Sequence, residues 1–135
     1  MDALIQNSEE HLSDWLRALG NDIVSDVKLS FGTSPPGREY THGSTTHIAS
    51  QPDYPPNIDT GLLRASINFK MLNKLSGRVQ DGTKYGVYLE LGSAYFSGDN
   101  KLEKRPFITP VMEKYRKQLL EHARKFGLIV KIARR

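Results

Sequence analysis

Five of the seven prolines in this chain lie between residues 33 and 57, and this segment limits the available folds more than any other. Proline breaks helices because it lacks a backbone N–H and its ring clashes with the preceding turn. Only four residues of the segment are apolar, so it cannot build a core of its own. Residues 38–41 and 45–49 flank the sequence His42-Gly43-Ser44, and we expect them to pair as a small hairpin.

An irregular segment of this length is rare inside a compact domain. We therefore expect an extended arm, residues 33–57, that lies on a neighbouring subunit rather than on its own core. Its prolines lower the entropy that is lost when the arm becomes ordered. The residues expected to make the subunit contact are Arg38, Tyr40, His47, Ile48 and Tyr54.

Two long amphipathic helices are predicted, one near each end of the chain. Apolar residues recur at steps of three and four between residues 8 and 31, where Ser8 is the expected N-cap. Residues 109–126 show the same spacing, with Thr109 as cap, Pro110 at the first helical position and Gly127 as the stop. The expected apolar stripes are Leu12, Trp15, Leu16, Leu19, Ile23, Val24, Val27 and Phe31, and then Met112, Tyr115, Leu119, Ala123 and Phe126.

Shorter elements lie between these helices. Asp59 is the expected cap of a short helix over residues 60–66, with Leu62 and Leu63 pointing inward. Alternating apolar residues predict a strand over 67–71, and residues 78–80 return as its partner. A second short helix is expected from Thr83 to Gly92, followed by a polar loop at 93–104.

Together these elements predict a single domain, residues 1–135, of the α+β class. A small antiparallel sheet would pack with two long amphipathic helices and two short ones, and the proline-rich arm or hairpin would extend from it. The expected parts are the N-terminal helix (8–31), the arm (33–57), the sheet and helices (59–126), and a C-terminal strand with a basic tail (127–135). The strand itself is expected at Leu128–Ile132.

The formal net charge of +4 is unevenly divided along the chain. Residues 1–60 carry three Lys and Arg against nine Asp and Glu, whereas residues 61–135 carry sixteen against six. Such asymmetry indicates either a basic face for nucleic acid or oppositely charged faces that meet between subunits. The expected basic face is Lys114, Arg116, Lys117, Arg124 and Lys125 on the outer side of the last helix.

Several kinds of chemistry find little support in the sequence. The chain has no cysteine, which excludes disulfides, thiolate catalysis and cysteine-ligated zinc. His42 and His47 show no metal-ligand spacing, and no phosphate-binding or nucleophile motif occurs, so we expect no metal, no cofactor and no enzyme activity. The triplet Asp59-Thr60-Gly61 occurs in dimeric aspartic proteases, but its flanking residues favour a helix cap. No apolar run approaches the ~18 residues of a membrane span, so no membrane partner is expected.

Three short segments occur in an order that points to a known family. They are Asp59-Thr60-Gly61-Leu62-Leu63-Arg64-Ala65-Ser66-Ile67, then Lys84-Tyr85-Gly86-Val87-Tyr88-Leu89-Glu90-Leu91-Gly92-Ser93, then Arg105-Pro106-Phe107-Ile108-Thr109-Pro110. Over residues 33–126 the chain resembles the neck or tail-completion proteins of long-tailed lambdoid bacteriophages, the proteins that join head and tail. Gly86 and Ser93 depart from that pattern, which usually has Ala and Thr there.

The resemblance implies a structural virion protein without catalysis that forms a ring in the neck, at the head–tail junction. A hexameric ring is favoured over a dodecamer, with neighbouring neck, tail-terminator or head-closure proteins as partners and passing genomic DNA as a non-specific contact. Assembly would take place in the cytoplasm of the bacterial host. The alternatives are a tail-terminator ring and a small non-specific nucleic-acid-binding module.

The expected structural residues of the resemblance are Asp59, Gly61, Glu90, Arg105 and Phe107. Glu90 is expected to form an ion pair with Arg105 or Arg64 that pins the second short helix to the following loop. Phe107, between two prolines, is expected to insert into the core.

Overall fold

The computed structural model describes the backbone of residues 2–92 and 102–128, and the side chains from Glu9 onward within those ranges. Its elements are α1 (Asp2–Ser30), β1 (Pro36–His42), β2 (Thr45–Ser50), α2 (Leu62–Ser66), β3 (Asn68–Asn73), β4 (Ser76–Gln80), α3 (Gly86–Leu91), α4 (Thr109–Lys117) and α5 (Leu119–Phe126). Most of the predicted loop 93–104, the strand expected at Leu128–Ile132 and the basic tail lie outside the described residues.

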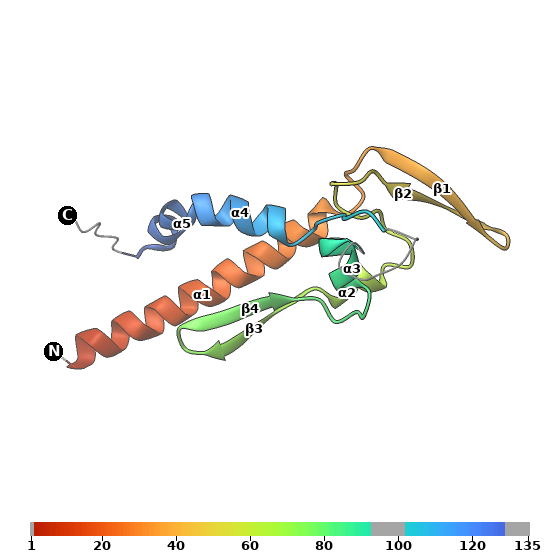
Figure 1. The fold of residues 1–135 in the computed structure, drawn as a ribbon. Helices are drawn as coiled ribbons and strands as arrows, with labels where there is room; N and C mark the ends of the chain where they lie inside the picture. The colour runs from red at the N-terminus through yellow and green to blue at the C-terminus, as the bar shows by residue number, and fades with distance from the viewer. Residues whose placement is uncertain (1, 93–101, 129–135) are drawn as a thin grey trace.

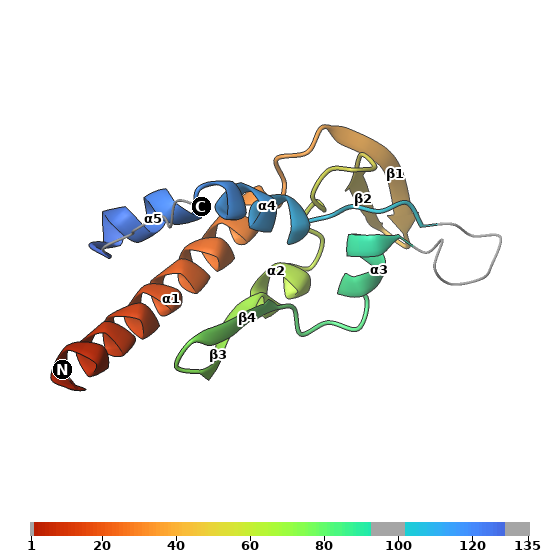
Figure 2. The same ribbon diagram turned by 60° about the vertical axis from the view of Figure 1, so that its left-hand side comes forward.

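The long helix α1 is the centre of the arrangement (Figure 1). Helices α4 and α5 lie along one side of it and the hairpin β3–β4 lies along the other, in agreement with the contacts of α1 with all four elements. The hairpin β1–β2 extends from the end of the molecule opposite the N-terminus, and the rotated view shows the same separation (Figure 2). The α+β prediction is confirmed, with two separate two-stranded antiparallel sheets.

The core forms around the C-terminal half of α1. Four members of the predicted stripe are buried there, and they pack with side chains from α2, α4 and the adjoining loops. The buried cluster is Leu19, Ile23, Val27, Phe31, Leu63, Ile67, Phe107 and Val111. Leu12 is exposed, and α1 begins at Asp2 rather than at Ser8, so the predicted cap is wrong. The early start has a simple reason, since residues 3–6 contain no helix breaker.

The hairpin β3–β4 packs on α1 through one aromatic ring. Strand β3 pairs with β4 in antiparallel register, with Phe69 opposite Val79. A Cβ atom placed on Gly20 of α1 would lie 2.3 Å from the Phe69 ring, and one placed on Gly77 of β4 would lie equally close. The ring therefore occupies space that only two glycines leave open.

The predicted last helix is two helices. Gln118 ends α4 with φ −106° and ψ 11°, and α5 begins at Leu119. The predicted stripe holds in part: Ala123 is buried, but in α4 the buried residue is Val111 whereas the predicted Met112 is exposed. Thr109 is the first residue of α4 and not its cap, while Gly127 ends α5 in the left-handed conformation as predicted.

The short helix α2 also begins differently from the prediction. Its N-cap is Gly61, whose φ of 81° favours glycine, and the Asp59 side chain makes no cap bond. The Leu62 backbone N–H instead donates to Thr60 Oγ1 at 3.3 Å. Leu63 is buried as predicted, but Leu62 is 59% exposed.

Candidate assembly interface

Glu90, at the C-terminal end of α3, caps the helix that follows it in the chain. Its carboxylate accepts three backbone N–H groups, from Phe107 at 2.8 Å, Ile108 at 3.1 Å and Thr109 at 2.8 Å. The first N–H groups of a helix have no partner within the helix, and negative charge is favourable there. The segment Arg105–Thr109 is thus held to α3, and Phe107, only 1% exposed, inserts into the core as predicted.

Arg105 joins the base of the hairpin β1–β2 to this junction. The guanidinium is buried, and it donates from Nε to the Ser50 carbonyl at 3.1 Å and from Nη1 to the Glu103 carbonyl at 3.1 Å. The predicted ion pair between Glu90 and either Arg105 or Arg64 is wrong. The reason is that backbone N–H groups occupy the carboxylate and backbone carbonyls occupy the buried guanidinium. The Glu90 carboxylate and the Arg105 guanidinium therefore form hydrogen bonds with backbone atoms rather than an ion pair with each other.

The predicted hairpin in the arm is confirmed, and its two ends differ. Strand β1 is exposed throughout, and the two large apolar residues of the paired strands, Tyr40 and Ile48, are 45% and 47% exposed. The base is attached to the body, because Arg105 Nε donates to the Ser50 carbonyl and the Asp53 backbone N–H donates to the Lys104 carbonyl at 2.9 Å. The arm is therefore joined to its own domain by polar contacts at the base, while its outer part lies away from the core.

The residues that were predicted to form the subunit contact of the arm lie at several places around the hairpin. Arg38 stacks over the Tyr40 ring at 5.5 Å from its centroid. Tyr54 follows the hairpin and is exposed. His47 Nδ1 lies 3.8 Å from Asp59 Oδ1, so Asp59 contacts the arm instead of capping a helix.

A cleft of about 290 Å³ lies between the hairpin and the short helices α2 and α3. Its walls include His47, Ser50 and Asp59, three residue types that form catalytic triads elsewhere. They form none here, because the buried Ser50 hydroxyl makes no hydrogen bond and the His47–Asp59 contact of 3.8 Å is longer than one. His47 and Ser50, three positions apart on β2, also point to opposite faces of the strand.

The predicted basic face is largely neutralised within the chain. Lys114 reaches α1, where its Nζ lies 2.8 Å from Asp26 Oδ2. Two further cations pair within their own helices, Arg116 with Glu113 at 3.9 Å and Lys125 with Glu121 at 3.0 Å. Of the five predicted residues, Lys117 and Arg124 are left without an ion pair to any described residue.

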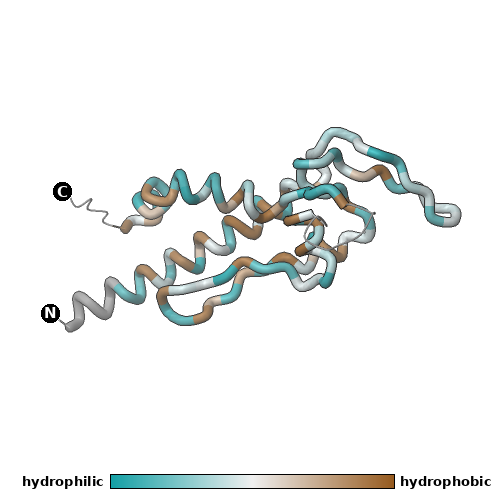
Figure 3. The backbone as a smooth tube through the Cα atoms, viewed as in Figure 1, coloured by the Kyte–Doolittle hydropathy of each residue, from teal (hydrophilic) through white to brown (hydrophobic). Residues whose placement is uncertain are grey.

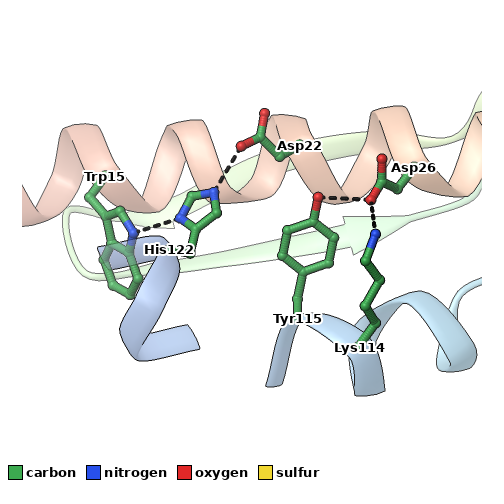
Figure 4. A network of polar contacts seen from close by, with 6 residues as sticks. All are labelled: Trp15, Asp22, Asp26, Lys114, Tyr115 and His122. Atoms are coloured by element: carbon green, nitrogen blue, oxygen red, sulfur yellow. Dashed lines mark hydrogen bonds and ion pairs between the residues drawn. The ribbon is translucent and has the colours of Figure 1, made fainter. Parts of the chain in front are cut away.

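A polar network joins α1 to α4 and α5 (Figure 4). The Trp15 indole N–H donates to His122 Nδ1 at 3.0 Å, and His122 Nε2 lies 2.8 Å from Asp22 Oδ2. One turn further along α1, Asp26 Oδ2 accepts bonds from Lys114 Nζ and from the Tyr115 hydroxyl, at 2.8 and 2.9 Å. Acidic residues of α1 thus meet the last two helices within one chain.

The electrostatics of this network follow from its contacts. The hydrogen bond from Lys114 holds the pKa of the Asp26 carboxyl below its ordinary value. Burial, together with the bond to Asp26, raises the pKa of Tyr115 to about 12. Trp15 and Asp22 are distant from His122 in the sequence, so only the antiparallel packing of α1 and α5 identifies the two partners of His122.

Large apolar side chains remain exposed on several elements of the described chain. Hydrophobic residues recur along α1 and the following elements, while β1–β2 is mostly hydrophilic (Figure 3). The exposed large apolar residues with the highest exposures are Leu29, Leu62, Leu72, Leu75 and Leu91.

No family model, curated protein or solved structure matches this chain. Within residues 2–92 and 102–128, no group of three His, Asp or Glu side chains is arranged to hold a metal ion. The same part of the chain contains no helix long and apolar enough to cross a membrane.

Proposed function

We propose that this chain is a structural, non-catalytic subunit of a ring in the neck of a tailed bacteriophage, at the junction of head and tail. The observation that carries the assembly part of the proposal is the set of five leucines that are more than half exposed on several elements of one chain. The neck itself is proposed from the three ordered segments that resemble neck and tail-completion proteins.

The positions of the resembling residues support a structural role. Gly61 starts α2, Glu90 caps α4, Arg105 holds the hairpin base and Phe107 fills the core. None of these four carries a nucleophile or a proton-transfer pair, and together they attach the hairpin β1–β2 to the body. The motif therefore builds a base from which the hairpin extends (Figure 2).

The hairpin is the part that we propose to reach the neighbouring subunit. Its paired strands expose Tyr40 and Ile48, and an isolated two-stranded hairpin is only marginally stable without further contacts. A closed ring uses a head-to-tail contact between two different patches, so the acceptor lies elsewhere on the next copy. Ring partners would be the neighbouring neck, tail-terminator or head-closure proteins in the virion.

Light scattering coupled to size-exclusion chromatography tests the assembly. We expect the mass of a hexamer or a dodecamer for the full chain, and ring-shaped particles by electron microscopy. The double variant Tyr40→Ser/Ile48→Ser should give monomers with unchanged thermal stability, because both side chains are about half exposed in the single chain. Leu120→Ser, which removes a similarly exposed leucine from α5 that is not among the five most exposed, is the matched control and should still form rings.

The neck assignment needs a separate test. Labelled antibody against this chain should mark the neck, between the head and the top of the tail, in electron micrographs of virions. A chain that stays monomeric at high concentration and is absent from virions would contradict the proposal. Labelling of the tail end of the junction alone would favour the tail-terminator alternative.

A further inference from the structure

Among the described residues, the hairpin β3–β4 carries a cluster of positive charges that no ion pair neutralises. Residues 60–80 contain four basic residues and no acidic residue. Lys70, Lys74 and Arg78 all lie within the hairpin, and none forms an ion pair with any described residue. On α4 and α5, by contrast, three of the five predicted cations are paired within the chain.

Two of these cations are placed against each other. Lys70 and Arg78 are direct cross-strand partners, so their side chains leave the same face of the hairpin. That face is the solvent-facing one, because Phe69 and Val79, the neighbouring pair, lie on the face that packs on α1. Like charges directly opposite each other destabilise a hairpin, and an external anion would remove this cost.

The other residues on the solvent-facing side of the hairpin, and those at its tip, also have the chemistry to contact a nucleic acid. Next to the two cations, Gln80 Nε2 donates to Asn68 Oδ1 at 3.2 Å, which leaves an uncharged polar pair on the same face. At the tip, Asn73 Oδ1 accepts the Leu75 backbone N–H, and Lys74 lies between two exposed leucines, Leu72 and Leu75. A two-stranded ribbon fits a groove of duplex DNA, and apolar tips of such proteins insert between base pairs.

We propose that the hairpin β3–β4 binds the phosphate backbone of double-stranded nucleic acid without reading its sequence. Lys70, Lys74 and Arg78 contact phosphates, and the pair Lys70/Arg78 is the centre of the contact. The proposal does not rest on the neck function, because the three cations and the paired strands β3 and β4 belong to a single chain. The competing partner is a second copy, whose acidic residues Glu10 and Asp14 on α1 have no ion pair to a described residue.

Fluorescence anisotropy of a labelled, random-sequence DNA duplex, measured over a series of salt concentrations, tests the proposal. The full-length variant Lys70→Gln/Arg78→Gln should bind at least about tenfold more weakly at low salt. Loss of two phosphate contacts should also make the slope of log K against log salt shallower by about 2 for each bound subunit. The variant should unfold at the same or a higher temperature, since the like-charge pair is gone.

The control variant Lys117→Gln/Arg124→Gln removes the same charge from the last two helices. It should keep nearly the affinity and the salt slope of the unchanged chain. Equal loss in both variants would mean that net charge alone drives binding, and absence of duplex binding at low salt would also overturn the proposal. Light scattering on the same samples measures self-association, and so tests whether the hairpin binds a second copy of the chain instead of DNA. Lost self-association with unchanged DNA binding would assign the hairpin to a second copy of the chain, whereas monomers that still bind DNA would count only against the ring.

Discussion

The carboxylate of Glu90 accepts the backbone N–H of Phe107 at 2.8 Å and so connects the end of one short helix to the start of the next. The same carboxylate also accepts the N–H groups of Ile108 and Thr109. A side chain distant in sequence therefore performs the capping that a local Ser, Thr or Asp usually performs. Because Phe107 is in the core and Arg105 holds the hairpin base, one carboxylate positions both the core and the arm.

Replacing Glu90 with Ala should lower the free energy of unfolding by about 2 kcal/mol, since it leaves three helix-start N–H groups without their acceptor. Glu90→Gln should cost less, because one amide oxygen still accepts. Urea unfolding followed by circular dichroism measures both. Arg64→Ala is the control, because Arg64 is exposed and was predicted, as an alternative to Arg105, to form an ion pair with Glu90. If Arg64→Ala costs as much as Glu90→Ala, the capping role is wrong.

Gly20→Ala should destabilise the fold by about 1–3 kcal/mol, although alanine is the better helix former by about 1 kcal/mol. The added Cβ would lie 2.3 Å from the Phe69 ring. A double-mutant cycle isolates this contact. In a Phe69→Ala background the ring is absent, so Gly20→Ala should become neutral or stabilising. The same cost in both backgrounds would show that the ring is not what Gly20 accommodates.

The elements that the sequence predicts best are those with local signals. The stripe of Leu19, Ile23 and Val27 required only helical periodicity, and it is buried. The turn residues around Gly43 predicted β1–β2, because glycine at positive φ suits a tight hairpin turn. The left-handed Gly127 similarly ends α5 where predicted.

The features that sequence reasoning missed depend on partners distant along the chain. Gln118 interrupts the last helix without proline or glycine, so no local pattern marks the break. Glu90 and Arg105 have opposite charges, which favoured an ion pair, but nearby backbone groups compete for both. The ion pair of Lys114, a residue of the predicted basic face, could not be predicted either, because Lys114 meets Asp26 only when α4 packs on α1.

The pair Asp26 and Tyr115 should make stability depend on pH at both extremes. The folded pKa of Tyr115 is about 12 and its unfolded pKa is about 10, so its contribution is complete below pH 10 and is lost as pH rises toward 12. The pKa of Asp26 is lowered, so its contribution is present above the unfolded value and is lost as pH falls below about 4. Tyr115→Phe should reduce the loss of unfolding free energy at alkaline pH, and Asp26→Asn should reduce the loss at acid pH.

Chemical unfolding at acid, neutral and alkaline pH checks these directions. Glu113→Gln, which removes an exposed acid paired only with Arg116, is the control for general charge effects. It should leave both limbs of the pH profile nearly unchanged. A Tyr115→Phe protein that loses stability above pH 10 as steeply as the unchanged chain would contradict the assignment of the alkaline limb.

His122 should determine how α5 packs on the N-terminal half of α1. The ring accepts the Trp15 indole N–H at Nδ1, so a proton on Nε2 must point to Asp22 in the neutral tautomer. His122→Leu removes both bonds and leaves the partly buried indole N–H without an acceptor, which should lower the free energy of unfolding by about 1–2 kcal/mol. Because Trp15 is the sole tryptophan, its fluorescence reports the change directly, with an emission maximum shifted to longer wavelength. His11→Leu, next to Phe126, is the matched control and should leave the emission in place. An unchanged spectrum and unchanged stability in His122→Leu would mean that the two helices are held by their apolar contacts alone.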